Sequence, residues 1–192
     1  MKKYELLERE ENSLCRIQAL RDIPRYGVKT GDIGGYVECE HNLSHEGLCW
    51  IGGYARVWGN AQICGDARVG GNARVCGNAL VCDNALVGGY AQVEGNAWVG
   101  ENALVGNNIY ISKNAKIKSS SDILYVCGIG SRFGGTTFYR TKTGISVTCG
   151  CFSDTLDEFK AQVTETHGDN KFAREYELAC QLAELHILGK EG

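Results

Sequence analysis

The amino-acid sequence predicts a mainly β fold in which short strands stack coil on coil, followed by a small α+β module. Alanine recurs every six residues from Ala55 to Ala103 and returns at Ala115, with Val or Ile two positions after each. Gly-Gly pairs recur every 18 residues, so that three six-residue units form one coil. The 192 residues are 43% hydrophobic and 22% charged, which excludes a disordered or collagen-like chain.

Each six-residue unit has the pattern Ala-x-(Val/Ile)-x-x-(Asn/Asp/Tyr). Residues two apart point to the same side of a strand, so the Ala and the aliphatic residue of each unit face the interior together. The Gly and Asn residues that follow tolerate the positive φ of a sharp corner. Because one unit cannot bury its apolar pair alone, we expect stability to come from the stacking of successive coils.

This pattern resembles the hexapeptide-repeat family over about five coils, residues 31–120. The resemblance implies a left-handed parallel β-helix of triangular section. Many hexapeptide-repeat proteins are acyltransferases that use acyl-CoA or acyl carrier protein between the subunits of a trimer, with a histidine as general base. The segments 16–22, 31–36 and 42–47 are also similar to repeat proteins of enterobacterial, phage and prophage genomes that are usually labelled as transferases.

The chain divides into three predicted segments, which are an N-terminal cap over 1–30, the β-helix over 31–120 and a C-terminal α+β module over 121–192. Strands are expected at about 2–7 and 13–20 in the cap, where they would protect the open end of the helix from edge-to-edge association.

The C-terminal module is expected to hold three strands followed by two helices. The apolar strand segments are 123–127, 136–140 and 145–149. A capping box begins the first helix at Thr155, and Gly168 ends it. Asn170 then caps a second helix over about 171–188.

Extending the repeat backwards places Cys39 and His45 at the inward aliphatic position, and Leu43 and Cys49 at the inward small position. The first coil is therefore predicted to be less regular than the later coils. We interpret His45 as a hydrogen-bonded capping residue beneath the N-terminal segment, and general-base catalysis is the alternative role.

Outward residues of the coils supply the candidate ligand-binding positions. Arg56 and Arg74 are stacked neighbours about 5 Å apart on one face, and they repel each other unless an anion, a carboxylate or water lies between them. Such a pair can hold a phosphate in bidentate fashion, whereas two solvated arginines are the alternative interpretation. The predicted ligand-binding residues are Arg56, Arg74, Arg68 and Tyr110.

Outward apolar residues predict self-association, because a monomer would expose them to water. The predicted interface residues are Leu80, Leu86, Trp98 and Leu104. A neighbouring subunit or the C-terminal helices would cover them. We expect a homo-oligomer, and the family resemblance favours a trimer.

No metal site and no cofactor is predicted. The chain has ten cysteines but no C-x-x-C pair. The γ-class carbonic anhydrases, which are related hexapeptide-repeat enzymes, need three histidines around zinc, and only His41 and His45 lie near the coils. Charged residues interrupt the N-terminus before a signal peptide can form, and no apolar run is long enough for a membrane span. We therefore expect a cytoplasmic protein without membrane association.

The predicted function is non-enzymatic: an oligomeric binding protein, of phage or prophage origin, that captures a small anionic, nucleotide-like ligand or a partner protein. Residues 49–118 contain neither a histidine nor an extruded loop, and this disfavours the alternative, an acyltransferase with acyl-CoA as cosubstrate and His45 as base. A structural spacer without a site is a further alternative. The net charge of −3 without a basic stripe disfavours general nucleic-acid binding.

Overall fold

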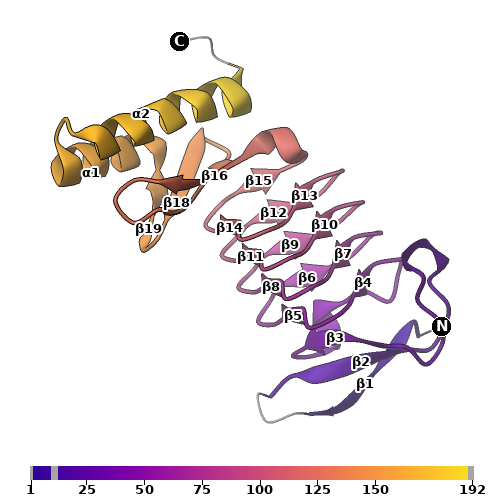
Figure 1. Cartoon of the computed structure of the whole chain (residues 1–192). Helices are drawn as coiled ribbons and strands as arrows, with labels where there is room; N and C mark the ends of the chain where they lie inside the picture. Colours follow the sequence, from indigo (N-terminus) through magenta and orange to yellow (C-terminus); the bar gives the residue numbers. More distant parts are fainter. Residues whose placement is uncertain (1, 10–12, 190–192) are drawn as a thin grey trace.

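The computed structural model describes residues 2–9 and 13–189. Short parallel strands wind into a β-solenoid of about five turns, which confirms the fold class predicted from the repeats. Figure 1 shows the N-terminal strands at one end of the solenoid and the two helices at the other. No helix in the described part of the chain is both long and apolar enough to cross a membrane.

The solenoid has three faces, each built from strands of successive coils. Face 1 contains β3 (Ile33–Val37), β5 (Arg56–Val57), β8 (Arg74–Val75), β11 (Gln92–Val93) and β14 (Tyr110–Ile111). Face 2 contains β4 (Trp50–Ile51), β7 (Arg68–Val69), β10 (Leu86–Val87) and β13 (Leu104–Val105). Face 3 contains β6 (Gln62–Ile63), β9 (Leu80–Val81), β12 (Trp98–Val99) and β15 (Lys116–Ile117).

The interior is a dry stack of the predicted apolar residues. Val57, Val75 and Val93 lie in register on face 1, and none of them is exposed to solvent. Between coils, backbone hydrogen bonds such as that from the N–H of Arg56 to the carbonyl of Ala73 (2.9 Å) satisfy the main chain. Each coil thus buries its apolar pair against the next coil, as the repeat pattern requires.

Glycine and asparagine have different roles at the corners. Gly77 has a φ of 70°, and a Cβ atom there would lie 2.9 Å from the backbone nitrogen of Gly95 in the next coil. Asn107 also has a positive φ, of 54°, at a corner. Four other asparagines are not among the residues with positive φ, and their side-chain amides hydrogen bond from coil to coil in a ladder of Asn60, Asn78, Asn96 and Asn114. The expectation that both residue types supply positive φ is therefore right for glycine and Asn107 and wrong for the asparagines of the ladder.

The first coil departs from the predicted register. Val37 and Leu43 occupy the inward aliphatic positions, so the placement of Cys39 and His45 there is wrong by two residues. The cause is the next corner, since Leu43 and Ile51 are eight residues apart whereas the equivalent residues of later coils are six apart. This added length places His45 beneath the N-terminal strand.

A 3₁₀ turn over Glu40–Asn42 closes the corner before Leu43. The side chain of Asn42 is fully buried at its centre. Its Oδ1 accepts hydrogen bonds from the N–H groups of Glu38 (3.1 Å) and Cys39 (3.0 Å). Its Nδ2 donates to the carbonyl oxygens of the next coil, at 3.0 and 2.9 Å. Every polar atom of this buried side chain is thus satisfied.

The N-terminal segment extends face 1. β1 (Tyr4–Arg9) pairs antiparallel with β2 (Cys15–Ala19), and β2 pairs antiparallel with β3. A 3₁₀ turn at Pro24–Tyr26 precedes β3. The hydroxyl of Tyr4 donates a hydrogen bond to the carbonyl of Leu43 (2.7 Å), which fixes β1 against the first coil.

The C-terminal module has four antiparallel strands in the order β16 (Ile123–Ile129), β17 (Gly134–Arg140), β18 (Ile145–Cys149) and β19 (Phe152–Thr155). The sequence analysis missed β19, because its Ser and Asp residues have low strand propensity and it forms by pairing with β18. Thr155 and Asn170 cap α1 (Leu156–His167) and α2 (Lys171–Ala183) as predicted. A π-helical turn, Glu184–Leu188, continues α2.

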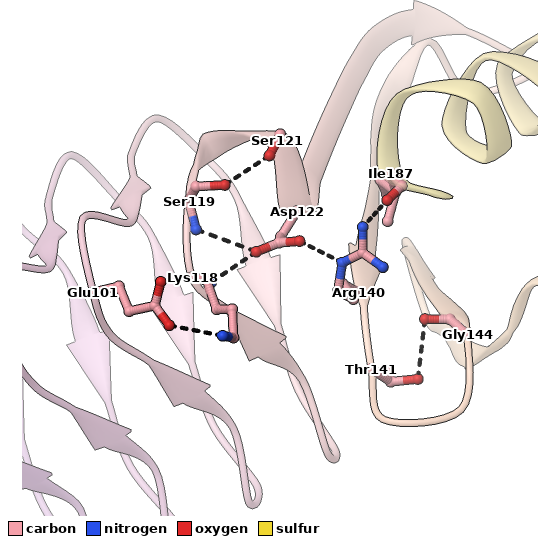
Figure 2. Close-up of polar contacts among 9 residues, drawn as sticks. All are labelled: Glu101, Lys118, Ser119, Ser121, Asp122, Arg140, Thr141, Gly144 and Ile187. Carbon is pink, nitrogen blue, oxygen red and sulfur yellow. Dashed lines mark hydrogen bonds and ion pairs between the residues drawn. The ribbon is translucent and has the colours of Figure 1, made fainter. Parts of the chain in front are cut away.

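A buried carboxylate joins the solenoid to this module (Figure 2). Asp122 lies in the 3₁₀ turn Ser120–Asp122 and accepts hydrogen bonds from the N–H groups of Lys118 (2.8 Å) and Ser119 (3.2 Å). Its other oxygen pairs with Arg140 of β17, whose guanidinium also donates to the carbonyl of Ile187. The Asp122–Arg140 pair therefore connects the last coil, the C-terminal sheet and the π-helical turn that continues α2.

Candidate anion-binding site

Arg56 and Arg74 lie side by side on face 1, as the repeat spacing predicts. They are register partners in adjacent coils, and both side chains are exposed. Neither guanidinium forms a hydrogen bond or an ion pair with any residue that the structure describes. Two like charges on neighbouring strands repel each other, so an anion bound between them would be stabilised.

An open groove of about 350 Å³ contains both arginines. Its other lining residues come from the corner that precedes face 1 and from β11. The full set is Tyr54, Arg56, Asn72, Arg74, Tyr90 and Gln92. We call this the arginine groove. Tyr54 and Tyr90 are 65% and 64% exposed, and the smaller Asn72 lies in the coil between them.

A third arginine supports one end of the groove. The guanidinium of Arg16 lies 4.9 Å from the ring centre of Tyr36 and 5.9 Å from that of Tyr54. It also donates hydrogen bonds to the carbonyl oxygens of Gly34 (3.0 Å) and Gly53 (3.2 Å). Arg16 thus adds positive charge beside Tyr54 while its own donors are partly occupied.

The carboxylates nearest to this face have other partners. Glu38 lines a neighbouring hollow that Arg56 and Arg74 also line, and its Oε2 accepts a hydrogen bond from the N–H of Gly59 (2.7 Å). Glu94 accepts a hydrogen bond from the hydroxyl of Tyr110. The charge of Arg56 and Arg74 is therefore not neutralised by an ion pair within the described residues.

Two of the predicted ligand-binding residues lie outside the groove. Arg68 is on face 2, where its guanidinium lies 5.2 Å from the ring centre of Tyr26. Tyr110 is on face 1 but next to the C-terminal sheet, where its N–H donates to Oγ1 of Thr137 (3.4 Å). Burial and the hydrogen bond to Glu94 raise the pKa of Tyr110 above its ordinary value.

Sequence reasoning missed Tyr54, Asn72, Tyr90 and Gln92 as groove residues. A signal was present, because Tyr54 and Tyr90 both follow Gly-Gly pairs at a separation of 36 residues. The two tyrosines therefore lie at the same corner of the solenoid, two coils apart. Their relation to the arginines depends on how the corner turns, which the period alone does not specify.

His45 lies beneath the N-terminal strand rather than at the groove. Its ring stacks on Tyr4 with 4.3 Å between centres, and its Nδ1 accepts a hydrogen bond from the N–H of Lys3 (3.2 Å). Its Nε2 is buried and has no partner among the described residues. Burial lowers the pKa of His45, mainly through desolvation of the charged ring. Both nitrogens are covered, so a bound acceptor could reach neither of them without displacing the N-terminal strand.

The predicted interface residues divide between two faces. Leu86 and Leu104 on face 2 are 39% and 53% exposed. Leu80 and Trp98 on face 3 are half-buried register neighbours. α1 and α2 pack with the C-terminal sheet in a separate hydrophobic cluster, away from these four residues.

The comparisons with known proteins agree with the solenoid. The family model described as the YdcK beta solenoid repeat matches residues 61–75 and 73–89. These residues belong to the regular coils that carry β6 to β10. A search of the curated proteins found no match to this chain.

In residues 2–9 and 13–189, no group of three or more His, Cys, Asp or Glu side chains is placed to hold a metal ion. All ten cysteines are free thiols.

Proposed function

We propose that this protein is a non-enzymatic binding protein whose arginine groove captures a small anion that carries a planar ring, such as a nucleoside monophosphate. The observation that carries this proposal is the Arg56–Arg74 couple, which has no hydrogen bond or ion pair among the described residues and lines a groove together with two exposed tyrosines. A phosphate between the guanidiniums would receive charge-assisted hydrogen bonds and relieve their repulsion. Tyr54 and Tyr90 offer ring faces on which a base can stack.

The acyltransferase alternative is less well supported. A general base must be within hydrogen-bond reach of the acceptor, whereas His45 is covered by Tyr4 and Lys3. His41 is exposed, but its Nε2 lies 2.7 Å from the side-chain nitrogen of Gln62 on face 3. Neither histidine lines the arginine groove. In a phage or prophage setting, binding without turnover would serve to sequester a nucleotide signal.

The proposal includes self-association through faces 2 and 3. These faces share the corner between β9 and β10, and both carry outward apolar residues next to it. A three-fold axis along this corner would cover Leu80, Leu86, Trp98 and Leu104 and leave face 1 with its arginines accessible. An interface here would remove the remaining apolar surface of these four residues from water, which favours association.

Titration calorimetry with adenosine 5′-monophosphate tests the proposed function. We expect Arg74→Ala to weaken binding about tenfold or more, because a charge-assisted hydrogen bond contributes about 1.5 to 3 kcal/mol. Arg68→Ala is the matched control, since Arg68 holds the same repeat position on face 2, and it should bind like the wild type. Adenosine, which lacks the phosphate, should bind more weakly.

Acetyl-CoA with a panel of hydroxyl and amine acceptors tests the alternative. Turnover that His45→Ala abolishes would overturn the proposed function. Equal affinity of the wild type and Arg74→Ala for the nucleotide would also overturn it, as would absence of nucleotide binding. In that last case the protein-partner and spacer functions would stand.

A further inference from the structure

A second cavity, of about 610 Å³, lies in the C-terminal module. It is bounded by the β16–β17 turn, the β18–β19 turn, α1 and one residue of α2. Its lining residues are Ser131, Arg132, Gly134, Gly135, Cys149, Gly150, Cys151, Phe152, Phe159, Gln162, Val163, Thr166, His167 and Tyr176. We call it the C-terminal cavity. Its volume is within the range of small-molecule sites.

Aromatic side chains form one wall of the cavity. The ring of Phe159 lies 5.2 Å from that of Phe152 and 5.4 Å from that of Tyr176, between ring centres. Phe159 and Tyr176 are nearly fully buried, so their packing holds the wall in place. This wall offers a preformed apolar surface to a ligand.

The β16–β17 turn is held close to α2. Gly130 has a φ of 70°, and a Cβ atom there would lie 2.0 Å from the hydroxyl of Tyr176. The N–H of Gly130 donates a hydrogen bond to the carboxylate of Glu175 (2.8 Å). Glycine is thus required at the point where the turn meets α2. The turn carries Arg132 to the cavity, where its Nη1 lies 3.8 Å from the Cβ position of Gly150.

The lining of the cavity is positively charged, whereas the C-terminal module as a whole is acidic. Acidic residues outnumber Lys and Arg in residues 119–192, yet no Asp or Glu lines the cavity. Arg132 is the one Arg or Lys in its lining, and it has no hydrogen bond or ion pair with any described residue. Burial raises the pKa of Tyr176 to about 12, so its hydroxyl remains a neutral donor.

We propose that the C-terminal cavity binds a small amphipathic anion, in which a carboxylate or sulfonate is attached to an aromatic or alkyl body. The unpaired guanidinium of Arg132 binds the anionic group, and the body packs on Phe152 and Phe159. The ligand differs from that of the arginine groove, because this site has a single guanidinium and an apolar wall. The two sites are independent, so either proposal can fail without the other.

The probe for this site is 8-anilinonaphthalene-1-sulfonate, whose fluorescence rises in apolar surroundings and whose sulfonate supplies the anion. We expect saturable binding in the wild type, with one component of the binding curve due to the C-terminal cavity. Arg132→Ala should weaken this binding about tenfold or more, because the charge-assisted hydrogen bonds to the sulfonate are lost. Arg132→Lys should restore part of the affinity. Arg174→Ala, an exposed arginine on α2 outside this cavity, should bind like the wild type.

Two further measurements locate the probe. N-Phenyl-1-naphthylamine has a similar apolar body without the sulfonate, and its affinity should be equal in the wild type and Arg132→Ala. Saturating 8-anilinonaphthalene-1-sulfonate should slow alkylation of Cys151, which lines the cavity, but not of the exposed Cys127 outside it. Unchanged sulfonate affinity in Arg132→Ala, or equal protection of both cysteines, would overturn the proposal.

Discussion

Val75→Asp, compared with Arg74→Asp in the same strand, tests the stacking that holds the solenoid together. The side chain of Val75 has no exposed surface and lies between Val57 and Val93. Its removal forfeits about 1.5 to 3 kcal/mol of apolar burial. A carboxyl group left there without a partner costs about 1 to 3 kcal/mol more, by comparison with protein mutational data. We therefore expect a loss of about 2.5 to 6 kcal/mol, a large part of the roughly 5–15 kcal/mol that is typical of unfolding.

The control, Arg74→Asp, places the same side chain one residue away on the exposed face, opposite Arg56. It should change stability by no more than about 0.5 kcal/mol, because it buries nothing. Urea denaturation followed by far-ultraviolet circular dichroism measures both variants. The difference between Val75→Asp and wild type should shrink from pH 7 to pH 4, because burial raises the pKa of a carboxyl group and protonation then favours the folded state. Equal denaturation midpoints for the two variants would refute the inward register of Val75.

Three further predictions concern the contact between Asp122 and Arg140, the covered His45 and the proposed subunit interface. Asp122→Ala removes the ion pair with Arg140 and leaves the N–H groups of Lys118 and Ser119 without their acceptor, so it should cost about 1 to 3 kcal/mol. Asp122→Asn, which keeps an acceptor, should cost less, and an unchanged urea midpoint in Asp122→Ala would contradict this. Because burial holds the pKa of His45 below its unfolded value of about 6.5, stability should fall as pH decreases below about 6.5; His45→Gln should lessen this dependence of the urea midpoint, and an unaltered dependence would argue against it. Leu86→Glu combined with Leu104→Glu should shift the protein towards monomer in sedimentation velocity, and a monomeric wild type at micromolar concentration would exclude this interface.

The candidate site was only partly predictable from the sequence. The period of 18 residues was sufficient to pair Arg56 with Arg74, because parallel stacking aligns equal positions of successive coils. It was not sufficient to place Arg68, which the same pattern carries to another face. The C-terminal cavity gave no sequence signal, since its residues come from two turns and two helices that approach only after folding.

The sequence by itself determined the solenoid, its inward apolar columns and the caps of both helices. Each of these depends on residues within one repeat or one helical turn, and local periodicity and hydrogen bonding decide them. The tertiary structure alone decided the two-residue shift in the first coil, the pairing of β19 with β18 and the position of Asp122 between three elements. These features depend on contacts between segments that are distant in the sequence. Val37 and Leu43 take the inward positions because the corner after Leu43 is longer than later corners and brings His45 against Tyr4. That contact joins two segments distant in the sequence, so the repeat pattern does not encode it.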